Sequence, residues 1–189
     1  MRYLTIGALL LSTTGAMAQT PAPAAPPAPA LVITSTAFED GGVIPDKYTQ
    51  NSPNPVSPAL SWENAPAKTV SFTLIMHDVD TLPRPTGPDN LHWMLINIPA
   101  TAKGLPEGVP AQAVLPDGTL NPLTQAGRKI GYLGMGAPKG PYHHYVFELY
   151  ALDIKLPPPS TEVPVRDEIL KAMDGHVLAK AAYVGRFHR

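Results

Sequence analysis

Two hydrophobic stretches that end in ionisable side chains constrain the fold of this chain more than any other feature. They run from residue 70 to 80 and from residue 92 to 98. Side chains on one face of a β-strand recur at every second position. Asp78 and Asp80 therefore extend the apolar face of the first stretch, and His92 extends that of the second. Because an unpaired charge buried in a core is costly, the pattern predicts two strands whose inward polar ends meet.

A third stretch, residues 143–153, repeats this arrangement. His143 shares its face with the apolar residues that follow at every second position, whereas His144 and Glu148 fall on the opposite face. A glycine-rich loop over residues 131–141 leads directly into His143, and successive amide groups in such a loop can point towards an anion. Three strands that end in inward ionisable groups predict one shared pocket.

The rest of the chain predicts a mainly β fold, an antiparallel β-sandwich with peripheral C-terminal helices. From residue 31 onwards, short β-rich stretches alternate with loops that contain proline and glycine. A helix is expected to begin near Asp167, a second short helix to cover 177–182 and a last strand to cover 183–187. Residues 100–125 predict neither helix nor strand and are interpreted as a long surface excursion.

The N-terminus has the features of an export signal. The chain starts Met-Arg, residues 4–11 are mostly apolar, and residues 16–18 read Ala-Met-Ala, a small-x-small cleavage site. A membrane-spanning helix needs roughly 20 apolar residues, so this run is too short to anchor the chain. The sequence predicts cleavage after Ala18 and a periplasmic or secreted protein whose mature chain does not span a membrane.

A segment composed almost entirely of proline and alanine follows, over residues 19–30. It lacks the side chains needed for a core, and repeated proline favours extended polyproline II. At about 3.1 Å per residue it forms a spacer of roughly 37 Å. Three parts are therefore predicted: a signal peptide over 1–18, a linker over 19–30 and one domain over 31–189.

Charge and cysteine content exclude several classes of function. The formal net charge is −1 with neutral histidine, which gives no support for nucleic-acid binding. The chain has no cysteine, and this removes disulfides, thiolate metal ligands and a cysteine nucleophile together. The candidate chemistry therefore rests on aspartate and histidine, at Asp78, Asp80, His92 and His143.

At these strand ends the sequence resembles the phosphatidylethanolamine-binding protein family, which includes the bacterial Raf-kinase-inhibitor-like proteins. The first family motif is Asp-Pro-Asp-Ala-Pro followed by a Trp-His-His-type strand. Here residues 78–83 read Asp-Val-Asp-Thr-Leu-Pro, and residues 91–93 read Leu-His-Trp. The second motif is Gly-x-Gly-x-Pro-Lys-Gly followed by His-Arg-Tyr-Val-Phe. It is matched by residues 134–140 and by His-His-Tyr-Val-Phe over 143–147.

Several positions depart from the family motifs, and Thr81 and Leu82 stand before Pro83, which implies a different shape for this loop. Val79 replaces the motif proline, Leu91 replaces the first histidine, Ala137 replaces a proline, and His144 replaces the arginine after the pocket histidine. These differences concern the size of the ligand and the surface offered to a partner. They leave the expected pocket residues in place.

The resemblance covers about residues 31–189 and implies a central β-sandwich with a small pocket for phosphate-type anions or phospholipid head groups. It implies a binding protein rather than an enzyme, with no metal or other cofactor. It also implies inhibition of a protein partner such as a protease or kinase. Carried over residue by residue, the ligand-binding set is Asp78, Asp80, His92, Gly136, Pro138, His143 and Tyr145.

Two other functions compete with this interpretation. Two aspartates and two histidines also suit a metal site by ligand type, so the pocket could belong to a metal-dependent or metal-free hydrolase. The sequence has neither an HExxH nor a GxSxG motif, which counts against that alternative. In a third interpretation the pocket is vestigial and the domain acts through its surface.

Overall fold

The computed structural model describes residues 28–81, 89–123, 129–159 and 165–189. The signal peptide expected over 1–18 and most of the linker expected over 19–30 lie outside these residues. Within the described part of the chain, no helix is long and apolar enough to cross a bilayer.

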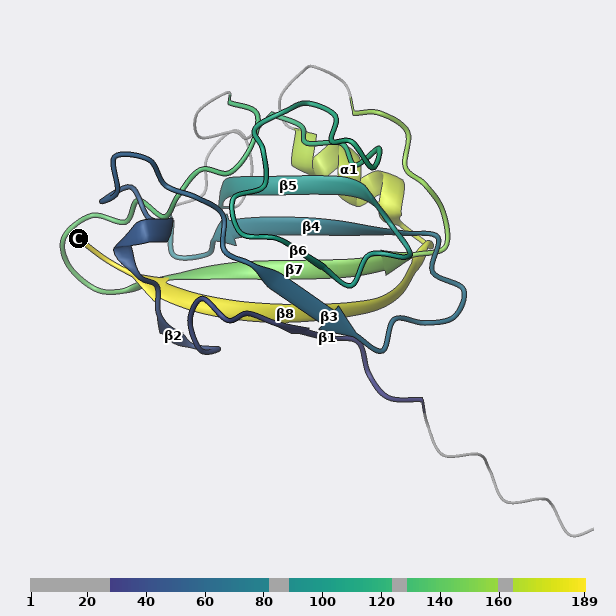
Figure 1. The fold of residues 1–189 in the computed structure, drawn as a ribbon, viewed down its shortest axis with the longest axis horizontal. Helices are drawn as coiled ribbons and strands as arrows, with labels where there is room; N and C mark the ends of the chain where they lie inside the picture. The colour runs from purple at the N-terminus through teal and green to yellow at the C-terminus, as the bar shows by residue number, and fades with distance from the viewer. Residues whose placement is uncertain (1–27, 82–88, 124–128, 160–164) are drawn as a thin grey trace, which may run out of the picture.

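Two β-sheets form the frame of the molecule (Figure 1). The larger sheet has five strands in the order β2 (Gly42–Val43), β8 (Val177–Phe187), β7 (His143–Leu152), β4 (Ser71–Asp78) and β5 (Asn90–Pro99). Adjacent strands in this sheet pair antiparallel, except for the parallel pair β2 and β8. The smaller, antiparallel sheet has the order β1 (Val32–Thr34), β3 (Leu60–Glu63) and β6 (Gly104–Leu105). A short 3-10 helix, η1, covers Asp46–Tyr48.

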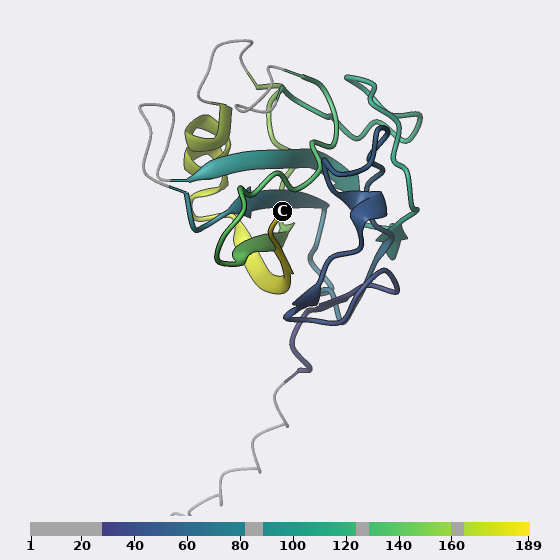
Figure 2. The same cartoon turned by 90° about the vertical axis from the view of Figure 1, so that its left-hand side faces the viewer.

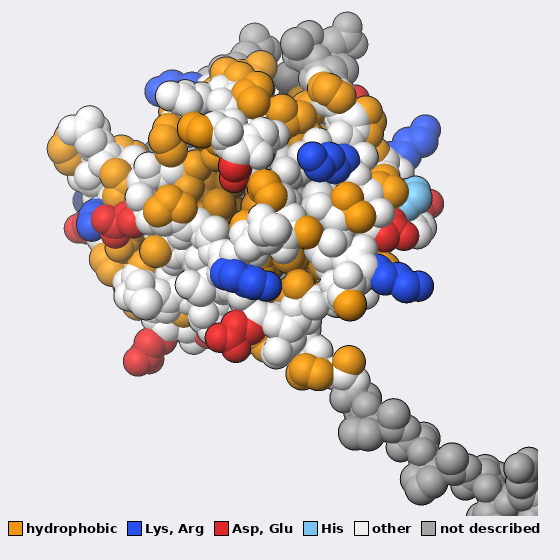
Figure 3. Space-filling model, turned by 45° about the vertical axis from the view of Figure 1, so that its right-hand side comes forward, with side chains coloured by type: hydrophobic (Ala, Val, Ile, Leu, Met, Phe, Trp, Pro, Cys, Tyr) orange, Lys and Arg blue, Asp and Glu red, His pale blue; other side chains and the backbone are white. Residues whose placement is uncertain are grey.

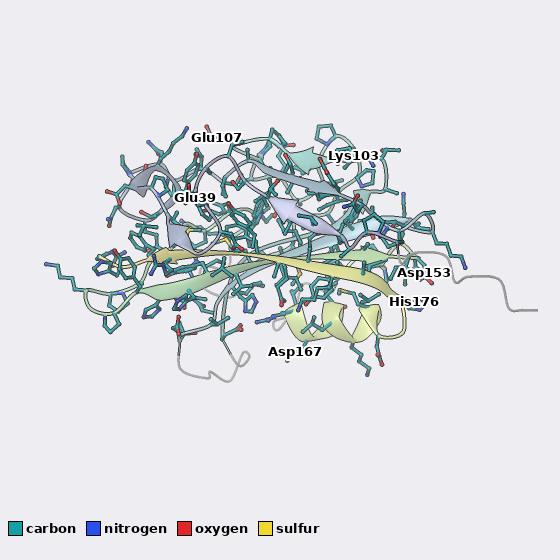
Figure 4. All side chains as sticks on the ribbon, turned by 90° about the horizontal axis from the view of Figure 1, so that it is seen from below. Glu39, Lys103, Glu107, Asp153, Asp167 and His176 are labelled. Carbon is teal, nitrogen blue, oxygen red and sulfur yellow. The ribbon has the colours of Figure 1, made fainter. Side chains whose placement is uncertain are left out.

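The main core fills the space between the two sheets. Trp62 of β3 is 2% exposed, packs 5.3 Å from the ring of Phe72 on β4, and donates its indole N–H to the carbonyl of Ala102. Figure 4 shows the three-stranded sheet and its loops on one side of the five-stranded sheet. The predicted β-sandwich is therefore confirmed.

A single α-helix covers the other side of the large sheet within the described residues (Figure 4). This helix, α1, spans Val165–Met173, and its side chains at every fourth position, Val165, Ile169 and Met173, are buried. They pack with Ile75 of β4 in a second core. Apolar material on both faces explains why all eight residues of β4 are buried.

Charged side chains fasten α1 to the sheet beneath it. Arg166 contacts the carboxylate of Asp89, which lies 2.5 Å from Nδ1 of His77. The Nε2 atom of His77 lies 3.5 Å from Glu148, and Glu148 also pairs with Lys180. Arg166, Asp89 and His77 are each less than 9% exposed. This buried network joins the helix to β4, β7 and β8.

The second helix predicted over residues 177–182 is wrong. These residues belong to β8, which pairs with β7 from Leu152–Val177 to His143–Phe187. The alanines and Lys180 favour a helix locally, but pairing along a whole neighbouring strand outweighs such weak preferences. The expected excursion over 100–125 also contains regular pairing, in β6 and in a bridge between Leu120 and Ile96.

Candidate functional site

Asp78 and His143 form a partly buried pair at one end of the five-stranded sheet. β4 and β7 keep a regular antiparallel register, with Asp78 opposite Tyr145. His143 lies two residues before Tyr145, and its Nδ1–H donates to the Asp78 carboxylate, at 2.8 Å from Oδ2 and 3.1 Å from Oδ1. Asp78 is only 2% exposed. The imidazole therefore supplies the partner that this buried carboxylate requires.

A β-bulge in β5 brings His92 to the same place. The register between β4 and β5 shifts between Met76 and His77, which leaves His92 as an extra residue on its strand. The Nδ1–H of His92 donates to the carbonyl oxygens of Leu133 and Gly134, at 3.1 and 3.2 Å. These bonds hold the imidazole against the glycine-rich loop.

The bulge overturns the predicted face of His92. Simple alternation placed it with Met94 and Ile96, but these two residues pack beneath α1. Trp93 and Leu95 instead pack between the two sheets. An inserted residue shifts the alternation of a strand by one, so His92 reaches the pocket through the bulge and not through a continuous apolar face.

His92 is held in its neutral form. Its Nε2 atom accepts a hydrogen bond from the Asn90 side chain at 3.1 Å, and its ring meets the ring of Tyr145 edge-on at 5.2 Å. Burial lowers the pKa of His92, and this effect outweighs the hydrogen bonds to the loop carbonyls and the charge of Asp78. Both ring nitrogens are already engaged within the protein, so His92 serves as a wall and a positioning group.

Tyr145 lies behind the Asp78–His143 pair and connects it to the loop. Its hydroxyl oxygen accepts a hydrogen bond from the Gly136 N–H at 3.2 Å, and the hydroxyl also bonds to Asp78. Burial and the nearby carboxylate raise the pKa of Tyr145 well above its usual value. The hydroxyl therefore stays protonated and fixes the loop relative to the strand.

The glycine-rich loop packs closely against residues 48–50. A Cβ atom on Gly134 would lie 3.0 Å from the backbone of Thr49, and one on Gly136 would lie 2.5 Å from the Gln50 side chain. Gln50 donates its backbone N–H to Met135 at 2.9 Å and its side-chain Nε2–H to Gly134 at 2.8 Å. Glycine allows this approach, which forms one wall of the pocket.

These groups surround a pocket of about 370 Å³. Its lining consists of Gln50, Asp78, Thr81, Asn90, His92, Leu133, Gly136, Ala137, Pro138 and His143. Five of the predicted site residues therefore line one cavity, and Tyr145 supports them from behind. The imidazoles and carboxylate lie at strand ends, whereas the loop supplies backbone groups.

Asp80 lies outside this cavity. β4 ends at Asp78, and the chain then turns, with the Asp80 backbone N–H donating to the Asp78 carboxylate at 3.1 Å. The Asp80 side chain accepts hydrogen bonds from the backbone N–H and the ring of His144, at 2.6 and 2.8 Å. Burial acts to raise the pKa of Asp80, but these bonds together lower it. Alternation fails for Asp80 because the strand has already ended.

Five lining residues were absent from the predicted site: Leu133 and Ala137 of the glycine-rich loop, and three with polar side chains, Gln50, Thr81 and Asn90. Asn90 lies two residues before His92 on β5, so its position was open to the same reasoning that led to His92. Thr81 immediately follows Asp80 and donates to the Asp78 carbonyl at 3.2 Å. Gln50 comes from a loop far away in the sequence, and no local signal marks it. The irregular loop expected after Asp80 lies outside the described residues over 82–88.

The donor geometry does not favour a metal centre. Within the described ranges, no group of three or more histidine, aspartate or glutamate side chains is arranged to hold a metal ion. Asp78 and His143 instead bond to each other, and Nε2 of His92, the nitrogen that could ligate a metal, accepts a hydrogen bond from Asn90. The metal-dependent hydrolase therefore gains no support from this arrangement.

A family model for phosphatidylethanolamine-binding proteins matches residues 34–188. A UPF0098 protein of Methanothermobacter thermautotrophicus is 39% identical over 157 residues, covering 81% of this chain and 95% of the relative. The UPF0098 protein YbhB of Escherichia coli is 34% identical over 165 residues, covering 82% and 98%. The match thus extends over almost the entire described domain.

Solved structures share the fold. The phosphatidylethanolamine-binding protein homologue CT736 from Chlamydia trachomatis superposes with a TM-score of 0.70 at 32% identity, covering 85% of this chain and 98% of that one. Escherichia coli YbcL gives a TM-score of 0.68 at 24% identity, which shows likeness of fold, over 84% and 98%. Fold, motifs and relatives agree, and the chain belongs to the phosphatidylethanolamine-binding protein family.

Proposed function

We propose that this protein binds a phosphate-type anion or a phospholipid head group in the pocket between Asp78, His92, His143 and Gly136, without catalysing a reaction. The observation that carries the proposal is their convergence on one cavity of about 370 Å³. Polar groups gathered in a preformed cavity of this size suit a small ligand. Family membership supports a binding role of this kind.

His143 is the group that we expect to donate a hydrogen bond to the anion. Its Nδ1–H is committed to Asp78, so its Nε2 can donate to a ligand only when the ring carries a second proton. The imidazolium then bridges the carboxylate and the anion, and hydrogen bonds of this charged kind are the stronger ones. His92 remains neutral and keeps the loop in position.

We predict that glycerophosphoethanolamine, whose phosphodiester keeps the same charge throughout, binds more tightly at pH 6 than at pH 8, because only a protonated imidazole donates from both nitrogens. Its affinity for the purified protein is measured by NMR titration at several pH values, and inorganic phosphate, which itself takes up a proton over this range, serves as a second probe. In a His143→Gln variant the affinity loses this pH dependence. A wild-type affinity that does not change with pH contradicts the role given to His143.

The control variant is His176→Gln. His176 pairs with Asp153 at 2.9 Å at the opposite end of the sheet from the pocket (Figure 4). Its substitution removes one exposed imidazole and leaves the pocket unchanged. Phosphate affinity and its pH dependence should match those of the wild type.

We also propose that the protein is exported, with cleavage after Ala18 and a periplasmic or secreted location. The support is the arrangement of a basic start, an apolar run and the Ala-Met-Ala site. The mass of the protein recovered from the cell envelope or the medium should correspond to a chain that starts at Gln19. An uncleaved chain found only in the cytoplasm contradicts this proposal.

By analogy with the family, we also propose that the protein inhibits a protein partner. An exported chain meets proteases more readily than cytosolic kinases, so a protease is the partner we expect. On the face seen in Figure 3, acidic and basic side chains are interspersed, as on a surface not specialised for nucleic acid. The measurement is the activity of a panel of secreted proteases with and without the purified protein, and we expect at least one of them to be inhibited.

A further inference from the structure

Arg189 lies at the rim of the pocket. Its backbone N–H donates to the carbonyl of Pro138 at 3.4 Å, and its side-chain Nη2 donates to Oε1 of Gln50 at 3.3 Å. Both Pro138 and Gln50 line the cavity. Figures 1 and 2 show the C-terminus beside the green loop that leads into β7, at the same end of the molecule.

Gln50 is held so that its oxygen faces the arginine. Its Nε2 donates to the Gly134 carbonyl at 2.8 Å, which leaves Oε1 as the acceptor for Arg189. The backbone N–H of Gln50 also bonds to Met135 at 2.9 Å. The guanidinium is thus attached to the wall of the pocket through a side chain that is itself fixed at two points.

The side chains that line the pocket carry little positive charge, and this makes the position of Arg189 at the rim important for binding an anion. None of the described residues that line the cavity is lysine or arginine, and Asp78 contributes a carboxylate. The imidazoles carry a positive charge only when protonated, whereas a guanidinium is charged at every relevant pH. Arg189 therefore brings a permanently charged guanidinium into contact with the wall of the cavity.

We infer that Arg189 is a specificity-determining residue that makes the pocket prefer ligands with net negative charge over zwitterionic ones. The inference rests on the proposed binding function. A phosphate dianion is attracted by the guanidinium, whereas the ammonium group of an ethanolamine head group offsets that attraction. Free phosphate and a phospholipid head group both present phosphate oxygens to the pocket. They differ in net charge, and this difference is what Arg189 would distinguish.

Arg186 provides a matched control only three residues away. It lies opposite His144 on β7, on the face of the sheet that points away from the pocket. Its guanidinium lies 5.3 Å from the ring centroid of Tyr142. Removing either arginine changes the overall charge equally, so a difference between the two variants isolates the local effect at the rim.

The experiment compares the affinities of inorganic phosphate and glycerophosphoethanolamine for the wild type, Arg189→Gln, Arg189→Lys and Arg186→Gln at pH 7 and constant salt. We expect Arg189→Gln to lower the preference for phosphate about three- to fivefold, the scale of an exposed charge contact. Arg189→Lys should keep most of the preference, and Arg186→Gln should keep all of it. Thermal unfolding verifies that each variant is folded.

An unchanged preference in Arg189→Gln overturns the inference, as does an equal loss in Arg186→Gln. If the wild type binds both probes and His143→Gln weakens them, the proposed function stands in either of those cases. If the folded wild type binds neither probe, the proposed function fails and the inference fails with it.

Discussion

The two imidazoles that line the pocket differ in what their nitrogen atoms face. Nδ1 of His92 meets two backbone carbonyls, and Nε2 meets the Asn90 amide. Nδ1 of His143 meets the carboxylate of Asp78. The same residue type is thus neutral and structural in one case, and adjacent to a negative charge in the other. Local hydrogen-bond partners separate the two roles.

Burial of His92 should make the protein sensitive to acid. The pKa of His92 in the folded protein lies below its unfolded value of roughly 6.5. Below that pH the unfolded chain binds a proton that the folded chain resists, so the free energy of unfolding falls. We expect the stability advantage of the wild type over His92→Gln to shrink between pH 7.5 and pH 5.5. Urea unfolding at both values measures it.

A stability difference that stays constant or grows on acidification contradicts this account of His92. Glu148 offers an internal comparison, because its pKa is lowered to about 2. Burial acts to raise this pKa, but the hydrogen bonds from His77, Lys180 and Tyr150 lower it by more than burial raises it. Its contribution is complete above roughly pH 4.5 and is lost only towards pH 2. A Glu148→Gln variant should therefore differ from the wild type by the same amount at pH 7.5 and pH 5.5.

Among the elements, α1 depends on a charged contact as well as on apolar packing. Arg166 reaches Asp89, and Asp89 reaches His77, all three in buried positions. Replacing Arg166 with Met leaves the Asp89 carboxylate without its guanidinium partner. Breaking a buried ion pair from one side is strongly destabilising. The helix is therefore sensitive to a substitution that leaves its apolar face intact.

We expect Arg166→Met to lower the free energy of unfolding by about 3 kcal/mol. Lys171→Met is the control, because it removes a positive charge from an exposed position on the same helix and should change stability by less than about 0.5 kcal/mol. Chemical denaturation measures both variants. Equal effects would mean that the buried network contributes nothing specific.

Strand regularity decided which parts of the site were predictable. β4 and β7 pair without interruption, so alternation alone brought Asp78 and His143 together. In β5 the bulge shifts the alternation at His92, and the local sequence carries no glycine or other signal that marks the bulge. The prediction that Asp80 lines the pocket was wrong for a related reason, because side chains alternate between faces only within a strand and β4 ends at Asp78. Local patterns thus predict contacts only where strands stay regular.

At the scale of the whole molecule, the sandwich and its family could be recognised from sequence, because both depend on many residues at once. Contacts between loops that are distant in the sequence could not be predicted in this way. Gln50 joins the pocket through bonds to Gly134 and Met135, and it also receives Arg189. The helical preference of residues 177–182 was overridden in the same way by pairing with β7. Long-range contacts, rather than local preferences, complete the site.

β4 carries Asp78 at its end and is enclosed by a core on each side. Amide hydrogens in such a strand exchange with solvent only when the whole domain opens. A ligand that binds the folded state alone makes that opening rarer. Occupancy of the pocket should therefore be readable as slower deuterium uptake along the entire strand, including amides that never approach the ligand.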